Sequence, residues 1–355
     1  MFRRLFFVKS LTAFPPFLRY TLPNPQPRMS AKALPFKSQP AQGLRPMDMR
    51  RDLRHIAALM DLCFGDTLDQ AGRGIVREME ALSRTGPLLW LLGSVAPHWN
   101  QGFVWIEDGK LVGNVSAQMA EYDRHIWLIA NVAVHPDYRR RGIGAALTEA
   151  AVRLAEQSGA RNAQLQVHQH NTGAYDLYRA LGFSTVTTRT TWERISVTQL
   201  PPVPLPGVEL RPARRDEWET VFKLAQALRP AGFNWLRPLR KAEWQPSLWR
   251  SLGNFMSGTH EERWLAIDSA ARKYAGAFFI ETGLGVTDHV SLVVRPEWHG
   301  RLERPLLSAA LRRLGKRPWA VRIDHPTGDE PIEAALQEFG FKSRQTLVWM
   351  QKDFA

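Results

Sequence analysis

The chain has 355 residues, of which 44% are apolar, and a formal net charge of +13. This length exceeds the usual size of one domain, so we expect two domains that each bury a core. Cys63 is the single cysteine, which excludes an intrachain disulfide and a cysteine-based zinc site and fits a reducing cytoplasm. The longest apolar stretch, residues 87–95, is about half of the ~18 residues that span a bilayer, so we expect no membrane partner.

The positive charge is concentrated at the start of the chain. Residues 1–47 hold eight Lys and Arg and no Asp or Glu, so the remaining body is only mildly basic. That balance does not indicate a nucleic-acid partner. We expect residues 1–40 to be a disordered leader or an extension upstream of a later start at Met29, and a targeting leader is the alternative.

An internal repeat organises the rest of the chain. Three landmarks recur in the same order, namely 43–46 with 209–212, 132–136 with 292–296, and 181–183 with 339–341. A proline-rich stretch separates the two copies and is typical of a semi-rigid spacer. We therefore predict a first domain at 41–195, a linker at 196–207 and a second domain at 208–355.

Hydrophobic periodicity and turn residues predict the elements of the first copy. The pair Asp108-Gly109 is a strong signal for a hairpin. Residues 125–134 are apolar on both faces, which favours a central strand covered on both sides. The predicted elements are a helix at 53–64, strands at 103–107, 110–119 and 125–134, a helix at 142–158, a strand at 164–168, a helix at 172–181 and a strand at 185–194.

The second copy repeats this order. Its predicted elements are a helix at 218–228, strands at 264–268, 274–281 and 290–295, a helix at 305–314, a strand at 320–323, a helix at 331–339 and a strand at 346–352. Each copy is expected to be antiparallel in its first half and strand–helix–strand in its second half. The fold class is therefore α/β, with a mixed sheet in each of two tandem copies.

A glycine-containing loop stands between the central strand of the first copy and the helix that follows. It reads Arg139-Arg140-Arg141-Gly142-Ile143-Gly144-Ala145. Glycines let the backbone approach a ligand closely, and the unpaired N–H groups of a first helical turn favour anions. Three arginines are unfavourable beside the positive end of a bare helix, and they become favourable when a pyrophosphate binds there. An exposed basic turn without a ligand is the alternative.

Two motifs flank this loop at a characteristic spacing. The strand end before it reads Val132-Ala133-Val134-His135-Pro136, and the string NTGAYDLYRALGF runs from Asn171 to Phe183. With these motifs, residues 44–194 resemble the GNAT superfamily of acyl-CoA-dependent N-acyltransferases. The resemblance implies a tandem pair of GNAT-type domains, with acetyl-CoA or another short acyl-CoA as co-substrate and no metal.

The resemblance also implies a role for individual residues. The strand end would bind the pantetheine arm, the loop amides would bind the pyrophosphate with the arginine side chains near the phosphates, and Asn171 would contact the pantetheine or adenine side. The implied cofactor-binding residues are Val132, Ala133, Val134, Arg139, Arg140, Arg141, Gly142, Ile143, Gly144, Ala145 and Asn171. Tyr178 would be the catalytic proton donor to the leaving thiolate, and packing against its helix is its alternative role.

The general base is where the chain departs from the family pattern. Many members carry a carboxylate just before the Val-x-Val, where this chain has Ala130 and Asn131. Side chains that could relay the proton through water instead are Glu121, Asp123, His125, His168 and His170, and each is equally explained as a solvated group. An isolated His-x-His without a carboxylate or cysteine partner does not indicate a metal site.

The second copy lacks the predicted site. Leu302 and Arg304 stand where the loop glycines would be, and Asp329 and Leu336 replace Asn171 and Tyr178. We expect this copy to keep the fold without the site. Its tryptophans are either core and interface residues or the lining of an acceptor cleft: Trp218, Trp235, Trp244, Trp249, Trp264, Trp298, Trp319 and Trp349.

The resulting hypothesis is a cytoplasmic N-acetyltransferase. It would move an acetyl or short acyl group from acyl-CoA to an amine in a ternary complex, since no nucleophile with a paired base is apparent. The acceptor would be a small molecule or a peptide, and by analogy with tandem members of the superfamily we expect the small molecule first, and a monomer whose two copies form a pseudo-dimer. The alternative is a non-catalytic acyl-CoA sensor or scaffold.

Overall fold

The computed structural model describes residues 42–65, 74, 77, 79, 101–120, 123–195, 202–233, 239–283, 287–315 and 317–354. The predicted leader, the apolar stretch at 87–95, Glu121 and Trp235 lie outside these residues. The chain divides into two compact units. Unit 1 contains Met1–Gln166, Gly173–Ser184 and Met350–Ala355, and unit 2 contains Val167–Thr172 and Thr185–Trp349.

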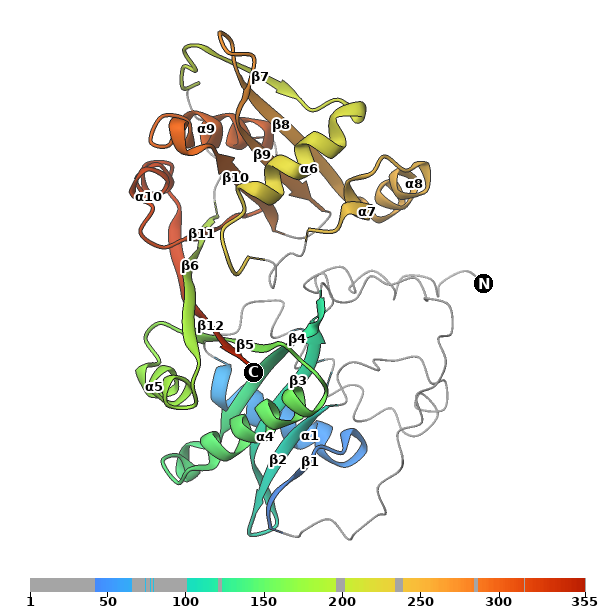
Figure 1. Ribbon diagram of the computed structural model, residues 1–355, viewed down its shortest axis with the longest axis vertical. Coiled ribbons are helices and arrows are strands. Elements are labelled where there is room, and N and C mark those ends of the chain that lie inside the picture. The colour runs from blue at the N-terminus through green and yellow to red at the C-terminus, as the bar shows by residue number, and fades with distance from the viewer. Residues whose placement is uncertain are drawn as a thin grey trace. The chain divides into compact units, whose positions relative to one another are not determined.

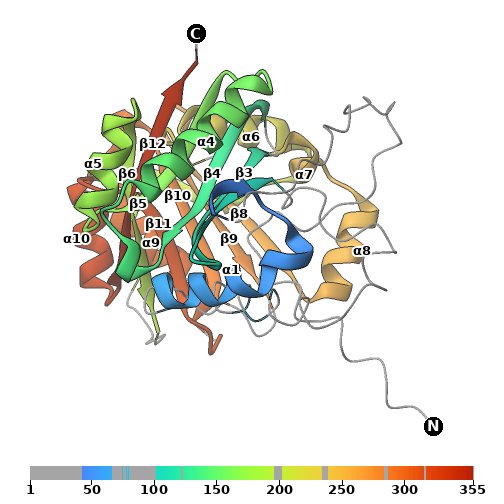
Figure 2. The ribbon, with the colours of Figure 1, turned by 90° about the horizontal axis from the view of Figure 1, so that it is seen from below.

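Unit 1 is built around a sheet in which strands follow the order β1-β2-β3-β4-β5 (Figure 1). All neighbours are antiparallel except β4 and β5, which are parallel. Helices α1 and α4 cover opposite faces of this sheet (Figures 1 and 2). The elements are β1 (Gly43–Pro46), α1 (Met49–Phe64), β2 (Gly102–Glu107), β3 (Lys110–Ala120), β4 (Asp123–Val134), η3 (Pro136–Tyr138), α4 (Ile143–Gln157), β5 (Asn162–His168) and α5 (Thr172–Ala180).

Local sequence explains these elements. Asp108 and Gly109 both have positive φ, as a two-residue hairpin turn between right-twisted strands requires. Helix α1 starts where the Asp48 carboxylate accepts the N–H of Arg50. Its apolar face, with Leu53, Ile56, Ala57 and Met60, packs on alternate residues of β2.

Unit 2 repeats the architecture, with the strand order β6-β11-β10-β9-β8-β7. Strands β10 and β11 are parallel, like β4 and β5. The core is formed by side chains of α9, α10 and the sheet, including Phe278, Leu306, Leu307 and Leu336. The elements are β6 (Ser184–Arg194), β7 (Val208–Pro212), η4 (Arg215–Glu217), α6 (Trp218–Ala227), α7 (Lys241–Trp244), α8 (Leu248–Ser257), β8 (His260–Asp268), β9 (Tyr274–Thr282), β10 (Asp288–Val294), η5 (Pro296–Trp298), α9 (Glu303–Leu314), β11 (Val321–Pro326), α10 (Glu330–Glu338) and β12 (Lys342–Asp353).

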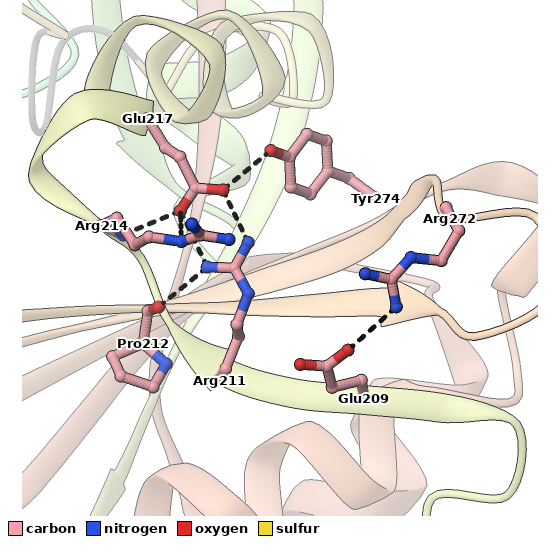
Figure 3. A network of polar contacts seen from close by, with 7 residues as sticks. All are labelled: Glu209, Arg211, Pro212, Arg214, Glu217, Arg272 and Tyr274. Atoms are coloured by element: carbon pink, nitrogen blue, oxygen red, sulfur yellow. Dashed lines mark hydrogen bonds and ion pairs between the residues drawn. The ribbon is translucent and has the colours of Figure 1, made fainter.

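The same ion-pair clamp ties the first strand to the first helix in both repeats. In unit 1 the Arg45 guanidinium donates to both carboxylate oxygens of Asp52, at 2.6 and 2.7 Å. In unit 2 Arg211 binds Glu217 in the same bidentate way, at 2.6 and 2.8 Å (Figure 3). The Tyr274 hydroxyl also donates to Glu217. The repeat therefore includes a shared side-chain contact, made by an aspartate in unit 1 and by a glutamate in unit 2.

Each unit receives its last strand segment from the other repeat. Strand β6 ends the first repeat, yet it pairs antiparallel with β11 within unit 2. The C-terminal residues of β12 belong to unit 1, where Gln351 accepts a hydrogen bond from Gln164 at 2.9 Å and Lys352 Nζ donates to the Leu181 carbonyl at 2.7 Å. The compact units thus differ at these two segments from the boundaries predicted at 41–195 and 208–355.

The mixed α/β fold predicted from the sequence is confirmed, and each predicted helix and strand is present with ends shifted by a few residues. Among the described elements, β1, β7, α7 and α8 were not predicted, and neither were the short 3₁₀ helices η3, η4 and η5. The strands β1 and β7 were missed because four or five residues carry little periodicity. No helix within the described ranges is long and apolar enough to cross a membrane.

Candidate active site

The candidate site begins where two parallel strands separate. Strands β4 and β5 pair from Ile126–Asn162 to Leu128–Gln164. Strand β4 then continues for six more residues, to Val134. Beyond Leu128 the edge of β4 has no register with β5. Such a split exposes backbone N–H and C=O groups that a ligand can pair with, as an added strand would.

A β-bulge lies in β4 beside this split. Ser116 pairs with Ala130 and Asn114 pairs with Ala133, so two residues of β4 oppose one of β3. The first of the two, Asn131, has a left-handed φ of 56°. The Asn114 amide donates to the Asn131 carbonyl at 3.0 Å. The bulge changes the direction in which the next backbone groups point.

The backbone of β4 alternates between β3 and the split. The N–H of His135 donates to the Val112 carbonyl at 2.8 Å, so in an antiparallel ladder Ala133 also faces β3. Val132 and Val134 then face the split. Ala133 was predicted to contact the ligand as well, but its N–H and C=O face β3.

The glycine loop forms an uncapped helix start. Arg140 and Gly142 have positive φ, of 62° and 79°, and α4 begins directly afterwards at Ile143. No described side chain caps this start, and its first turn holds no acidic residue. The first-turn N–H groups of Ile143, Gly144 and Ala145 have no acceptor within the helix. A Cβ at Gly142 would meet nothing within 4 Å, so the loop surface there is open to a ligand.

The three loop arginines have different surroundings. Arg139 donates to the Val134 carbonyl at 3.2 Å. Arg141 binds the Glu107 carboxylate at 3.1 Å and lies over the Tyr138 ring. Within the described part of the chain, no ion pair or hydrogen bond involves the Arg140 side chain. The expectation that all three side chains lie near phosphates thus fits Arg140 best, because the other two already have partners.

Cys63 lies beside the same strand end. Its thiol, at the end of α1, donates to the Val134 carbonyl at 3.4 Å. Burial raises the pKa of the Cys63 thiol, and the nearby Arg139 guanidinium partly offsets that rise. The thiol therefore stays protonated at neutral pH.

Tyr178 is buried on α5, with 6% of its surface exposed. Its ring packs edge-to-face on Phe183. Burial raises the pKa of Tyr178 to about 12, so the hydroxyl holds its proton throughout the physiological range. Asn171, predicted to contact the cofactor, belongs to the segment of unit 2 just before α5, where its N–H donates to the His168 carbonyl at 2.9 Å.

The candidate bases on β4 lie far from the bulge. Asp123 is nine residues before Val132 on the same strand, which is roughly 30 Å at the rise of a β-strand. Its carboxylate pairs with Arg161 and accepts the N–H of His125. Neither Asp123 nor His125 can therefore reach an acyl group held at Val132.

His168 and His170 stand at the end of β5 and just after it. The rings of His168 and His170 lie 5.2 Å apart in the short segment of unit 2. Burial, together with the charge of His170, lowers the pKa of His168. Across the described residues no group of three or more His, Cys, Asp or Glu is arranged to hold a metal ion.

The corresponding region of unit 2 is built differently. Strands β9 and β10 pair without a bulge from Glu281–His289 to Gly276–Val294. Helix α9 begins at Glu303, a residue that is 4% exposed and whose carboxylate lies 3.8 Å from His299. The chain thus places its own carboxylate at this helix start, where a phosphate would be repelled.

A network of polar side chains lies beside this helix start in unit 2. His299 contacts Asp329 at 3.0 Å, and His325 contacts the other oxygen of Asp329 at 2.8 Å. The hydrogen bond from His325 is the main cause of a lowered pKa of Asp329. Asp329 occupies the position that Asn171 has in the first repeat, so the substitution noted in the sequence serves a local network.

Some tryptophans of unit 2 lie in the core, and others line a cleft. Trp349 is buried in the core and the Trp264 ring stacks on Phe278. Trp218, Trp244 and Trp264 line a cleft of about 1310 Å³. The guanidinium of Arg263 lies over the Trp244 ring, so this cleft is partly filled by cation–aromatic packing.

Sequence reasoning missed Asn114, Glu107 and Cys63. The signal for the bulge was available, because Asn tolerates positive φ better than other non-glycine residues and Asn131 directly precedes the Val-x-Val. Glu107 and Cys63 carry no local signal, since each contacts a residue far away in the chain.

Comparison with known proteins identifies the family of the first repeat. A family model described as "Acetyltransferase (GNAT) family" matches residues 76–183. The [ribosomal protein bS18]-alanine N-acetyltransferase of Escherichia coli (strain K12) is 34% identical over 95 residues, which is 25% of this chain and 62% of that protein. The chain thus covers less than two thirds of this relative. A Bacillus subtilis (strain 168) protein, to which the same activity is assigned provisionally, is 32% identical over 115 residues, 30% of this chain and 71% of its own length.

Solved structures extend the likeness to both repeats. A tandem GNAT protein from the clavulanic acid biosynthesis pathway aligns over 87% of this chain and 98% of its own, with a TM-score of 0.53 and 18% identity. A GCN5-related N-acetyltransferase from Sphaerobacter thermophilus aligns over 88% of this chain and 96% of its own, with a TM-score of 0.58 and 17% identity. At these identities the likeness establishes the fold. The matched family model and relatives, together with the tandem fold, show that the chain belongs to the GNAT family of acetyltransferases.

Proposed function

We propose that the protein is an N-acetyltransferase that moves an acetyl or short acyl group from acyl-CoA to an amine. One observation carries the proposal. Within unit 1, an exposed β4 edge at Val132 and Val134 runs directly into an uncapped, acid-free helix start at Gly142. The first feature suits an amide-containing arm and the second suits a diphosphate, and coenzyme A joins both in one molecule.

Different residues of unit 1 would bind different parts of the cofactor. The C=O of Val132 and the N–H of Val134 would pair with the pantetheine amides. The N–H groups of Ile143, Gly144 and Ala145 would bind the pyrophosphate, with the Arg140 side chain adding positive charge. The contacts of Arg139 and Arg141 keep the loop in shape instead. We propose Asn171 as a further cofactor contact on the basis of the motif alone.

Transfer would proceed in one ternary complex. The acceptor nitrogen attacks the thioester carbonyl, the C–N bond forms, and the C–S bond breaks as the tetrahedral intermediate collapses. The Val132 N–H would stabilise the developing oxyanion. Tyr178 would donate its proton to the leaving thiolate, and the raised pKa of Tyr178 keeps that proton available.

The lack of a nearby base bears on the acceptor. No carboxylate stands on the described part of β4 at the bulge, where the chain has Ala130 and Asn131. An amine with a low pKa needs less help to lose its proton, and α-amino groups have a pKa near ~8 against ~10.4 for lysine. We therefore propose an acceptor with a weakly basic amine, in a small molecule first and in a peptide N-terminus second.

The names of the relatives suggest which peptides to test as acceptors. The Escherichia coli relative is named for an alanine of ribosomal protein bS18. Another relative from that organism, named a peptidyl-lysine N-acetyltransferase, is 37% identical over 86 residues. An acceptor panel should contain small amines, a peptide with an N-terminal alanine and a peptide with an internal lysine. Faster transfer to the lysine peptide at pH about 7 would contradict the proposed preference.

Cofactor binding is the direct test. Calorimetry with acetyl-CoA should give binding in the wild type, and Gly142→Asp should weaken it at least about 100-fold, because it puts a carboxylate against phosphate and strains a left-handed position. Gly109→Asp is a matched control, since Gly109 also has positive φ but lies in the β2–β3 turn. Equal affinity in the wild type and Gly142→Asp would refute the loop assignment.

The missing base also supports a second candidate function, a non-catalytic acyl-CoA sensor. In that case acetyl-CoA would bind but no amine of the panel would be acetylated. Tyr178→Phe would then leave every measured property unchanged. Turnover of any amine at a rate that Tyr178→Phe lowers would exclude the sensor.

A further inference from the structure

A buried amide lies in the centre of the unit 1 sheet. Asn114 on β3 is 0% exposed. Its Nδ2 donates to the Asn131 carbonyl at 3.0 Å, while its Oδ1 receives no hydrogen bond from the residues described. Burying an amide that is only partly satisfied destabilises the fold, because one of its polar atoms has lost water without gaining a partner. A valine or leucine would be the more stable choice at such a position, so its single hydrogen bond requires an explanation.

That hydrogen bond orients one peptide unit. A trans peptide is planar, and its C=O and N–H point in opposite directions. Because the Asn131 carbonyl is turned towards Asn114 on β3, the N–H of Val132 must point away from β3, towards the split between β4 and β5. The left-handed φ of Asn131 makes this orientation compatible with the strand.

A second contact supports the same geometry. The side-chain amide of Asn131 donates to the Ser116 hydroxyl at 3.4 Å. Asn114 and Ser116 flank the β3 residue that the bulge leaves opposite two residues of β4. The bulge is therefore held from both sides by side chains of β3, and the shorter contact is the one from Asn114.

Unit 2 supplies a comparison within the same chain. Val134 pairs with Gly113 in unit 1, and Val294 pairs with Gly276 in unit 2. The residue after each glycine is Asn114 in unit 1 and Ala277 in unit 2. The repeat without the asparagine has no bulge in its strand β10.

We propose that Asn114 is a positioning residue that holds the β4 bulge, so that the Val132 N–H points at the carbonyl oxygen of the bound acyl group. This inference rests on the proposed acetyl-CoA site. Asn114 does not touch the cofactor itself, because its side chain ends at the Asn131 carbonyl. It acts on the transition state by orienting the peptide unit between Asn131 and Val132. A substitution of Asn114 should therefore change kcat rather than cofactor affinity.

The main test replaces the amide by an apolar side chain of similar size. Asn114→Leu should lower kcat about 30-fold or more, since losing one oxyanion donor costs ~100-fold or more in enzymes that depend on it. The dissociation constant for acetyl-CoA should stay within about threefold, because the loop and Val134 are unchanged. Ala277→Asn is the matched control in unit 2 and should change neither quantity.

A second variant keeps the test valid if Asn114→Leu does not fold. Asn114→Asp cannot donate when ionised and can donate when protonated, and burial raises the pKa of such a carboxyl. The ratio of kcat in Asn114→Asp to that in the wild type should therefore rise at least about fivefold between pH 8.5 and 6. A merely structural role would leave the ratio flat.

Three results would separate the hypotheses. A wild type that does not bind acetyl-CoA refutes the proposed function and with it this inference. Normal binding with kcat of Asn114→Leu within about twofold of the wild type refutes the positioning role alone. A pH-independent ratio for Asn114→Asp refutes it as well.

Discussion

At the scale of single residues, the hydroxyl of Tyr178 determines the chemistry expected on the leaving side. Tyr178→Phe should lower kcat about 100-fold, a typical contribution of one general acid. The change in acetyl-CoA affinity should be about twofold or less, because the ring and its packing on Phe183 remain. Steady-state rates with the best acceptor, and calorimetry with acetyl-CoA, measure the two quantities.

The pH profile gives an independent check on the same residue. The pKa of Tyr178 is raised to about 12, so the proton-donating form persists up to about pH 11. The rate should therefore show no loss at high pH that comes from this tyrosine within the usual assay range. A basic limb near pH 9 that disappears in Tyr178→Phe would contradict the burial that the structure shows.

At the scale of elements, the clamp between β7 and α6 should govern acid stability of unit 2. The hydrogen bonds and charge of Arg211 lower the pKa of Glu217 to about 2 (Figure 3). A carboxylate with a lowered pKa stabilises the fold above its ordinary pKa of about 4.5 and loses that contribution as the pH falls towards 2.

The variant Glu217→Gln measures this contribution. At about pH 7 it should lower the free energy of unfolding by about 1–3 kcal/mol, since it removes charge-assisted hydrogen bonds. Near pH 2.5 the two proteins should unfold at nearly the same urea concentration. Glu209→Gln is the control, because Glu209 makes one exposed contact with Arg272 and should change stability little.

Most elements could be predicted from the sequence, because their signals are local. The hairpin at Asp108-Gly109 and the helix start after Gly142 depend on residues next to one another. The hydrogen bond that holds the bulge could not be predicted, since it joins Asn114 to a residue 17 positions away. The partner of Arg141 was missed for the same reason, because Glu107 lies 34 positions away.

The exchange of last strand segments between the two repeats could not be predicted from the sequence, for a different reason. Residues 185–194 and 346–352 were both predicted as strands, and both are strands. Alternation specifies which face of a strand is buried but not which of two similar sheets it joins. Repeats of one fold therefore leave the pairing of their final strands open at the sequence level.

At the scale of the whole molecule, the chain should bind one acetyl-CoA. Unit 2 lacks the bulge and places Glu303 at the start of α9. Calorimetry should give a stoichiometry of about one, and Gly142→Asp should abolish it without uncovering a weaker second site. A stoichiometry of two would show that the second repeat retains a cofactor site.

The exchanged strands predict the fate of the isolated first repeat. A fragment ending at residue 195 lacks Gln351 and Lys352, which belong to unit 1, and leaves β6 without its partner β11. We expect this fragment to be less soluble than the full chain and to bind acetyl-CoA at least about tenfold more weakly. A fragment that binds with full affinity would show that the exchange is dispensable.

The exchange also makes the two repeats thermodynamically dependent on each other. Neither unit can unfold without also unfolding a strand segment that belongs to the other repeat in sequence. Heating should therefore produce a single cooperative transition rather than two. A ligand that binds only the native state raises the melting temperature, and the rise grows with the logarithm of ligand concentration once that concentration exceeds the dissociation constant. Acetyl-CoA held at the β4 edge of unit 1 should thus slow hydrogen exchange of amides in β10 and β11, strands that belong to unit 2.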